Sequence, residues 1–198
     1  DIHIHDLDYY PTKTTTCIQY DLDDLFERGF RTKNGSIRTP QSIQSYATLA
    51  TIIFQTNQNE QHGGQAIPAF DFFMAKGVRK THLKHLQTLT DFYREVERKE
   101  PNEDALKKIE EKALAMTRKD THQAMEGFIH NLNTMHSRGG NQVVFSSINY
   151  GTDTSAEGRM VIEELLKATI EGLGSRGEVP VFLSLIHISE PTRPRLIS

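Results

Sequence analysis

Hydrophobic residues recur at helical spacing in four stretches of the chain. The spacing predicts helices over residues 39–59, 79–99, 103–135 and 155–173. Thr39 and Pro40 suit the cap and the first position of a helix, and Asp153 or Ser155 suits the cap of the last one. The third stretch is highly charged but periodic, so we interpret it as a helix with a solvated face.

Two further stretches are rich in β-branched residues and predict strands. They cover residues 13–20 and residues 142–148, and the second is entered through a Gly-Gly pair. Residues 21–29 indicate a short acidic helix or turn, and residues 33–36 indicate a turn through their Asn-Gly pair. Strands separated by long helices predict an α/β architecture in which helical insertions dominate.

Length and charge narrow the classes of protein that the chain can represent. Its 198 residues suit one domain or a large piece of one, and its formal net charge is −3. This near balance gives no electrostatic reason to expect nucleic acid or a membrane surface as a partner. No apolar run reaches the ~18–20 residues that span a bilayer. The first residues lack the features of a signal peptide and an initiator Met, so we expect the chain to begin within a longer protein.

Cys17 is the one cysteine in the sequence. It excludes a disulfide framework and a cysteine-rich zinc site within these residues, so we predict a reducing, cytoplasmic location. A lone cysteine on a strand is usually a small buried hydrophobe. Three threonines precede this one, however, and a thiol in a polar pocket can exchange a proton or a hydrogen atom.

The last residues, Leu183–Ser198, differ in pattern from the rest of the chain. Their string Leu-Ser-Leu-Ile-His-Ile-Ser-Glu-Pro-Thr-Arg is similar to a sequencing adapter translated in frame. A native tail with two prolines and no clear periodicity is the alternative. We expect the segment to be adapter-derived, poorly ordered and in little contact with the rest, and we take residues 1–182 as the native part.

Polar clusters at three further places could carry chemistry. His3 and His5 lie two apart, which on a strand puts both imidazoles on one face and suits a metal in some hydrolases; orienting the following turn is the alternative. In the segment 62–65, two glycines let the backbone approach a ligand, although a plain helix cap would look the same. The Gly-Gly loop at residues 138–142 suits reading a polar ligand such as a base, or is an ordinary connection.

Taken in order, these segments resemble the anaerobic, glycyl-radical (class III) ribonucleotide reductases. The motifs that carry the resemblance are His3-Ile-His5-Asp6-Leu-Asp8-Tyr9-Tyr10, Thr15-Thr16-Cys17, His62-Gly63-Gly64-Gln65, Arg138-Gly139-Gly140-Asn141-Gln142 and Phe145-Ser146-Ser147-Ile148-Asn149. The resemblance covers residues 1–182. It implies an internal fragment of the catalytic subunit, forming part of a ten-stranded α/β barrel that is built from two parallel five-stranded sheets.

The resemblance also implies roles for single residues. Cys17 would face the ribose and serve in its reduction. The residues expected around the substrate are Thr15, Thr16, His62, Gly63, Gly64, Gln65, Ser146 and Ser147. Those expected in the loop that links the specificity effector to the substrate base are Arg138, Gly139, Gly140, Asn141 and Gln142. Those expected as polar groups behind the substrate contacts are His3, His5 and Asp6, and no metal ligand is expected here.

Other parts that the family needs are expected outside this chain. They are the cysteine that becomes a thiyl radical, the C-terminal glycyl radical, a four-cysteine zinc site and an ATP-binding regulatory domain. Formate would be the reductant, deoxynucleotides and ATP the effectors, and a radical-SAM enzyme the activator. We expect a homodimer with its face on a helix near residues 40–59 or 79–99, and no reductase activity from the fragment alone.

Three alternatives stay open at this point. Another glycyl-radical enzyme of the formate-lyase type would share the barrel, but typically has adjacent cysteines on its finger loop. A hydrolase that binds metal through His3 and His5 would need ligands at later strand ends, whereas the other histidines fall on predicted helices. A helical interaction module would explain residues 79–135 but not the polar strand that holds Cys17.

Overall fold

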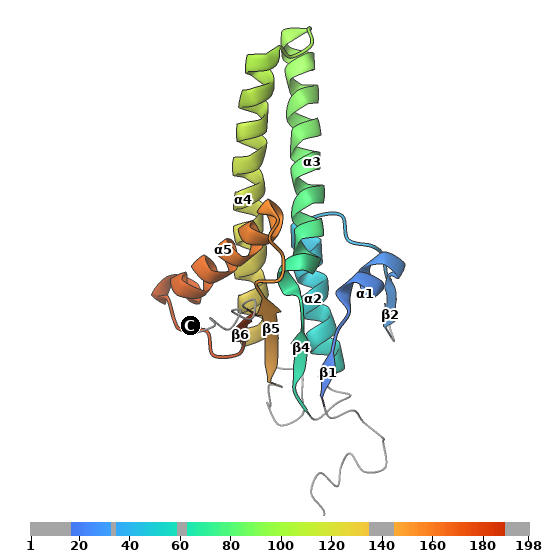
Figure 1. The fold of residues 1–198 in the computed structure, drawn as a ribbon, viewed down its shortest axis with the longest axis vertical. Coiled ribbons are helices and arrows are strands. Elements are labelled where there is room, and N and C mark those ends of the chain that lie inside the picture. Colours follow the sequence, from blue (N-terminus) through green and yellow to red (C-terminus); the bar gives the residue numbers. More distant parts are fainter. Residues whose placement is uncertain (1–16, 33–34, 59–62, 135–144, 189–198) are drawn as a thin grey trace, which may run out of the picture.

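The computed structural model describes residues 17–32, 35–58, 63–134 and 145–188, which form a mixed α/β fold (Figure 1). The strands are β1 (Ile18–Gln19), β2 (Phe30–Thr32), β3 (Gly35–Ile37), β4 (Gln65–Ile67), β5 (Ser146–Tyr150) and β6 (Ser184–His187). The helices are α1 (Leu22–Arg28), α2 (Ile43–Asn57), α3 (Phe70–Glu97), α4 (Glu103–Thr134) and α5 (Ala156–Glu171), with a 3-10 turn at Gly174–Arg176. The α/β prediction is confirmed. The described strands form an open sheet and a separate hairpin, without closing into a barrel.

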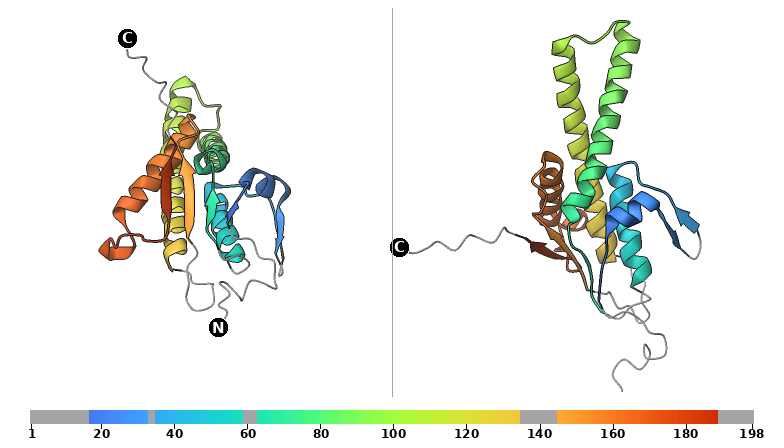
Figure 2. Two further views of the ribbon diagram at one scale, coloured as in Figure 1. Left: turned by 60° about the horizontal axis from the view of Figure 1, so that its bottom comes forward. Right: turned by 45° about the vertical axis from the view of Figure 1, so that its right-hand side comes forward.

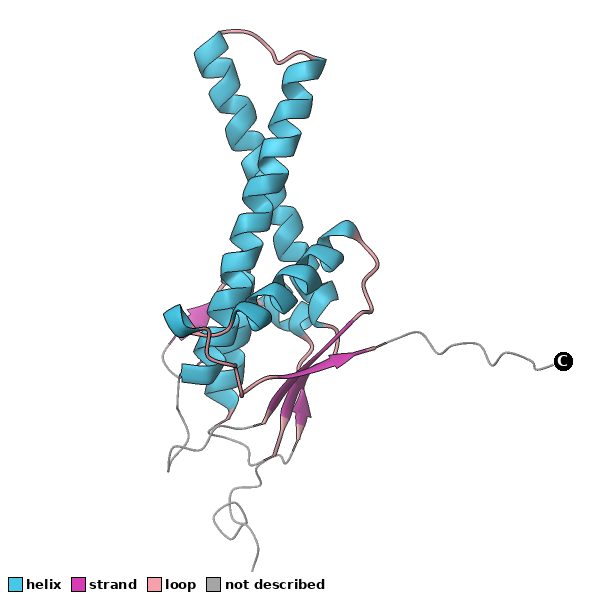
Figure 3. Cartoon of the chain, turned by 90° about the vertical axis from the view of Figure 1, so that its left-hand side faces the viewer, coloured by secondary structure: helices cyan, strands magenta, loops and turns pink. Residues whose placement is uncertain are grey.

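The main sheet has four strands in the order β1-β4-β5-β6, and all neighbouring strands are parallel. Gln65 of β4 lies opposite both Ile18 of β1 and Ser146 of β5, so these strands are aligned at one level. The helices lie on one face of the sheet, which we call the covered face, and Figure 3 shows no helix on the other, open face. Ile67 and Ile148 are fully buried on the covered face.

Aromatic side chains from three helices meet in the core above the covered face. The ring centroid of Phe128 on α4 lies 6.2 Å from that of Phe54 on α2 and 5.1 Å from that of Phe70 on α3. All three rings are buried. Full burial of a Phe side chain contributes roughly 1.5–3 kcal/mol. The core therefore fixes α2, α3 and α4 relative to the sheet.

Helix α2 begins three residues later than the sequence predicted. Ser42 is its cap: the Ser42 hydroxyl accepts a hydrogen bond from the backbone N–H of Ser45, and the Ser45 hydroxyl accepts one from the N–H of Ser42. This reciprocal cap satisfies two backbone donors, which a Thr39-Pro40 start could not do. Pro40 therefore precedes the helix.

Helices α3 and α4 form a long antiparallel hairpin that projects away from the sheet (Figures 1 and 2). α3 begins at Phe70, nine residues before the predicted start. Position 77, inside α3, is a glycine. A side chain there would come within 2.9 Å of the Tyr46 ring, so glycine lets α2 and α3 pack closely. α4 begins where predicted, at Glu103. Two His–carboxylate contacts join the hairpin: His82 to Glu110 at 3.0 Å and His85 to Asp120 at 2.9 Å.

The strand predictions are correct in place but not in extent. β1 and β5 fall at the ends of the two predicted strands, while residues 13–16 and 142–144 lie outside the described residues. β4 was not predicted, because a three-residue strand after two glycines looks like a helix cap in sequence. β2 and β3 pair antiparallel, and β3 begins at Gly35, so the predicted turn at residues 33–36 is wrong for Gly35 and Ser36, while residues 33–34 lie outside the described part.

The expectation that the chain makes few contacts from residue 183 onward is wrong for residues 183–188. β6 pairs in parallel with β5 along its whole length, and Leu183 and Leu185 pack against the core. The physical reason is that Leu183 and Leu185 lie two residues apart, so a parallel strand that pairs Leu185 with Ile148 can place both leucines on the covered face. This pairing shows how the segment packs, but it does not test where the segment comes from. Its origin in an adapter stays a prediction. Residues 189–198 lie outside the described part.

Among the helices of the described residues, not one is both long enough and apolar enough to cross a membrane.

Candidate active site

A hollow of about 420 Å³ lies on the open face, where β1, β4 and β5 begin. The residues that line it are Cys17, Ile18, Gln19, Gly64, Gln65, Ala66, Phe145 and Ser147. Segments from three distant parts of the chain thus meet at one edge of the sheet. Parallel strands bring this about, because their starting ends lie side by side.

Strand alternation places the Cys17 thiol on the open face. Ile18 packs against the core on the covered face, so its neighbours Cys17 and Gln19 must point the other way. In β5 the same alternation puts Ser147 on the open face, between Ser146 and Ile148. Cys17 is exposed and forms no disulfide. The thiol and the Ser147 hydroxyl are therefore presented by two strands to the same side of the sheet.

Gly64 and Phe145 shape one wall of the hollow. A side chain at position 64 would come within 3.3 Å of the Phe145 ring, so the glycine makes space for this ring. The backbone N–H of Gln65 donates to the carbonyl of Phe145 at 2.9 Å, and that of Ile18 donates to the carbonyl of Gly64 at 3.1 Å. The Phe145 side chain is 65% exposed and is free to contact a ligand.

Below the hollow, the side chain of Gln65 joins three strands. Its Oε1 accepts a hydrogen bond from the Tyr20 hydroxyl at 2.9 Å, and its Nε2 donates to the Ser146 hydroxyl at 3.0 Å. All three residues are buried. Burial raises the pKa of Tyr20, against a smaller opposing effect of its hydrogen bond with Asn57, so the phenol keeps its proton and stays a donor.

The structure brings together part of the predicted site. Cys17, Gly64, Gln65 and Ser147 line the hollow, and Ser146 lies directly beneath it. Gly63 is described and precedes the lining residue Gly64. The predicted residues that lie outside the described part are His3, His5, Asp6, Thr15, Thr16, His62, Arg138, Gly139, Gly140, Asn141 and Gln142.

Sequence reasoning missed five residues of the site. Ile18, Gln19, Ala66 and Phe145 line the hollow, and Tyr20 supports it from below. Alternation along the strand of Cys17 could have identified Gln19, which shares its face. No pattern in the sequence indicates that Tyr20 reaches β4, because their pairing is set by the fold.

Within the described residues no three His, Cys, Asp or Glu side chains gather as metal ligands. The described histidines of α3 and α4 instead contact single carboxylates or, for His122, two glutamates on opposite ring nitrogens. These side chains offer no donor set that fits a zinc ion. His3 and His5, on which the hydrolase alternative rests, lie outside the described residues.

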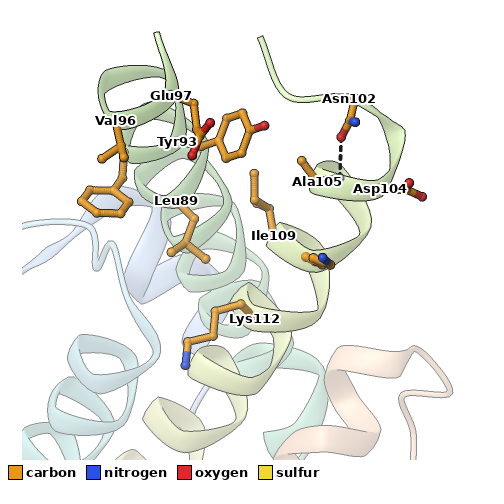
Figure 4. Close-up of a pocket in the computed structure, with 11 residues that line it drawn as sticks. Leu89, Tyr93, Val96, Glu97, Asn102, Asp104, Ala105, Ile109 and Lys112 are labelled. Carbon is orange, nitrogen blue, oxygen red and sulfur yellow. Dashed lines mark hydrogen bonds between the residues drawn. The ribbon is translucent and has the colours of Figure 1, made fainter. Parts of the chain in front are cut away.

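A second hollow, of about 580 Å³, lies between α3 and α4 near the tip of the hairpin (Figure 4). Tyr93 and Ile109 point into the space between the helices, and Asn102 caps α4 by accepting a hydrogen bond from the N–H of Ala105 at 2.9 Å. The rim is rich in exposed apolar side chains: Phe92 and Val96 are 63% and 59% exposed. This surface lies on the hairpin, away from the Cys17 hollow.

Comparison with known proteins gives one consistent result. Residues 1–190 match the family model described as anaerobic ribonucleoside-triphosphate reductase. The chain is 33% identical over 190 residues to the protein of that name from Enterobacteria phage T4, covering 96% of this chain and 29% of the phage protein. It is 30% identical over 187 residues to the protein of the same name from Escherichia coli, covering 94% of this chain and 24% of that protein. The Haemophilus influenzae protein is 29% identical over 187 residues. The chain thus spans 24–29% of the length of these relatives.

Proposed function

Because the chain belongs to the anaerobic ribonucleoside-triphosphate reductase family, we propose that it is part of an enzyme that makes deoxyribonucleoside triphosphates by radical chemistry. The observation that carries the proposal is the exposed Cys17 thiol, presented beside Gly64 and Ser147 in a hollow at the starting ends of parallel strands. The family match leaves the formate-lyase and hydrolase alternatives without a supporting observation.

The proposed reaction replaces the ribose C2′–OH bond by a C2′–H bond. The hydroxyl oxygen leaves as water. Formate supplies two electrons and one hydrogen as it is oxidised to CO2, and one proton from solvent completes the balance. The glycyl radical, expected outside this chain, supplies the unpaired electron that starts such chemistry, since side chains do one-electron chemistry poorly without a radical or cofactor.

Within this scheme, the Cys17 thiol donates a hydrogen atom or proton to the ribose. The open face suits this role because the thiol is exposed next to polar groups rather than sealed among leucines. The Ser147 hydroxyl can hold a ribose oxygen through a hydrogen bond. Gly64 lets the substrate approach the backbone closely, and the Phe145 ring offers an apolar wall.

The open face also suits a larger barrel. A parallel sheet is almost always covered on both faces, and here the described helices cover only one. We propose that the rest of the ten-stranded barrel lies against the open face and encloses the hollow. The cysteine that becomes a thiyl radical would come from that part, as would the C-terminal glycyl radical and its zinc site.

We propose that the intact enzyme is a homodimer, with the hairpin of α3 and α4 as its face. Two helices were predicted as possible dimer faces, at residues 40–59 and 79–99. The apolar side of α2 is buried within the chain, so we assign the dimer face to residues 79–99 of α3. Leu83, Phe92 and Val96 on α3 are each more than half exposed. We further propose that the enzyme is cytoplasmic, that deoxynucleotides and ATP regulate it, and that a radical-SAM enzyme activates it. The loop at residues 138–142 would transmit the binding of the effector to the site that recognises the substrate base.

The test of the proposal is Cys17→Ser in the full-length, radical-loaded enzyme. Serine keeps the shape of the side chain but is a far poorer hydrogen-atom donor than cysteine. We expect deoxynucleotide formation to fall to background in an anaerobic assay with formate, a ribonucleoside triphosphate and the activating enzyme. Nucleotide binding should stay within about twofold of wild type, because the lost interaction belongs to turnover rather than affinity.

Two controls make the result specific. Loading of the glycyl radical, measured by its electron paramagnetic resonance signal, should be unchanged in Cys17→Ser. Thr154→Ser, an equally small change in the exposed segment before α5, should keep full turnover. Wild-type turnover by Cys17→Ser would overturn the role of this residue.

A further inference from the structure

Gln65 is a polar residue at a core position. Its side chain lies on the covered face, two residues before the fully buried Ile67, and Gln65 itself is only 2% exposed. A leucine or methionine of similar volume would fill the same space without polar atoms to satisfy. Buried hydrogen bonds add little net stability compared with a well-packed apolar replacement. Stability alone therefore does not explain a glutamine at this position.

The hydrogen bonds of Gln65 run across the sheet. From β4 the side chain reaches Tyr20, which directly follows β1, and Ser146, the first residue of β5. Both ends of the amide are used, at 2.9 and 3.0 Å. Because an amide has a donor end and an acceptor end, the bridge fixes both the distance and the order of the three strands.

Strand β1 needs such a fixation more than the other strands. It has two residues, and the backbone hydrogen bonds that hold it to β4 run from Ile18 N–H to the Gly64 carbonyl at 3.1 Å and from Tyr20 N–H to the Ala66 carbonyl at 3.0 Å. A slip of β1 by one residue would turn Cys17 from the open face to the covered face. The Tyr20 hydroxyl reaches Gln65 only in the observed register.

We infer that Tyr20, Gln65 and Ser146 form a register bridge, whose function is to hold Cys17 in place over the hollow relative to Gly64 and Ser147. The inference rests on the proposed function of Cys17 and extends it to the layer below. Gln65 and Tyr20 are positioning residues: they act on the substrate only through the strands they join. Burial of all three side chains keeps water from competing for the bridge.

The test compares Gln65→Met and Tyr20→Phe in the full-length, radical-loaded enzyme. Both variants approximately keep the volume of the side chain. Gln65→Met removes both hydrogen bonds of the bridge, and Tyr20→Phe removes the one between Tyr20 and Gln65. We expect Gln65→Met to lower kcat at least about tenfold with KM for the ribonucleoside triphosphate within about twofold, because displacement of a reacting group affects turnover most. Tyr20→Phe should lower kcat in the same way, and the double variant should be no slower than Gln65→Met alone, since both changes break one unit.

Thr81→Val is the matched control. Thr81 is also buried, and its hydroxyl accepts from the N–H of Ile43 and donates to the carbonyl of Gly77, each at 2.9 Å, between α2 and α3. It should lower the unfolding temperature at least as much as Gln65→Met does, yet leave kcat unchanged. If Gln65→Met does not fold, Tyr20→Phe decides alone.

Each outcome has one meaning. A kcat for Gln65→Met and Tyr20→Phe within about twofold of wild type would overturn the inference, as would an equal loss in Thr81→Val. Cys17→Ser, assayed beside them, distinguishes a failure of the register bridge from a failure of the proposed function. If Cys17→Ser is inactive and the bridge variants are normal, only the bridge is refuted; if Cys17→Ser is active, the proposed function itself fails.

Discussion

Asp71 shows how much one side chain can organise in this fold. It lies in the first turn of α3 and is fully buried. Its carboxylate accepts hydrogen bonds from the backbone N–H groups of Gly151 and Asp153, both at 2.9 Å, and from the hydroxyl of Thr152 at 3.1 Å. These donors belong to the segment between β5 and α5. Asp71 thus ties the start of α3 to the end of β5, and a carboxylate suits this because it only accepts.

Asp71→Asn should be destabilising. The N–H groups of Gly151 and Asp153 share one carboxylate oxygen, which the asparagine oxygen can replace only as a weaker, uncharged acceptor, and the asparagine NH2 faces the Thr152 hydroxyl, which must turn to accept. We expect a loss of about 1–3 kcal/mol in the free energy of unfolding, from the weakened hydrogen bonds. Calorimetry on the full-length protein would show this as a lower unfolding temperature. Asp91→Asn, an exposed change on the same helix, should unfold at the wild-type temperature, and equal behaviour of the two variants would contradict the role of Asp71.

The sequence predicted individual site residues only where they belong to a motif. Cys17, Gly64 and Ser147 were identified from motifs, and they meet in one hollow. The side on which Gln65 lies could not be predicted. β4 has three residues, too few for an alternation pattern, and its register follows from pairing with β1 and β5. Pairing between strands that are 45 and 81 residues apart is a property of the fold rather than of a local pattern.

At the scale of elements, α4 and α5 are joined by a cluster of charges around Glu164. The Glu164 side chain is 4% exposed and contacts Arg118 at 2.8 Å, Lys167 at 3.0 Å and His122 at 3.1 Å. Burial alone would raise the pKa of Glu164, but hydrogen bonds from Lys167 and Arg118 outweigh it, so its pKa is lowered. The carboxylate therefore stays ionised and paired between the two helices.

This cluster predicts a pH dependence with a defined sign. A carboxyl group whose pKa is lower in the folded state stabilises the fold above its unfolded pKa of about 4.3, and this contribution disappears as the pH falls through the folded value. Glu164→Gln should lower stability at pH 7 by about 1–2 kcal/mol, because the buried carboxylate is lost, while Arg118 and Lys167 are nearly half exposed and keep their contacts with Glu163. It should also flatten the decline in unfolding temperature below about pH 4.5.

Glu163→Gln provides the matched comparison for that experiment. Glu163 contacts the same Arg118 and Lys167, but its side chain is half exposed. Solvent screens such pairs, so the variant should lose little stability. The measurement is the unfolding temperature of full-length wild type and both variants between pH 3 and 8. An equal loss in the two variants, or a wild-type pH profile for Glu164→Gln, would contradict the importance of burial.

Helices were predicted better than strands for a physical reason. α4 repeats its apolar positions over 32 residues, and α5 begins at the predicted cap Ser155, so local periodicity and capping suffice. β1 and β4 contain two and three residues, and their existence depends on partners far along the chain. The early start of α3 has the same origin, since Phe70 is buried against Phe128 of α4.

At the scale of the whole molecule, the hairpin of α3 and α4 is the part least explained by this chain alone. It projects beyond the sheet, and it exposes apolar side chains along its outer half, among them Leu83, Phe92, Val96, Leu106 and Leu114. Several large, exposed apolar side chains gathered on one charged helix pair are typical of an interface. A second copy of the chain, related by a two-fold axis, could cover both hairpins at once, which is the arrangement that the proposed homodimer requires.

Phe92→Asp tests that arrangement in the intact enzyme. Phe92 is 63% exposed, so the monomer loses little by the change, whereas a dimer face would have to bury an unpaired charge beside apolar neighbours. We expect the variant to dissociate at concentrations where wild type is a dimer, as measured by light scattering with effector present. A loss of affinity of at least about a hundredfold corresponds to the ~2.7 kcal/mol typical of a residue at the centre of an interface. Ile170→Asp is the control, because Ile170 is 85% exposed on α5, away from the hairpin, and should leave the dimer intact. Dimeric Phe92→Asp, with an unchanged dissociation constant, would move the interface to another surface of the enzyme.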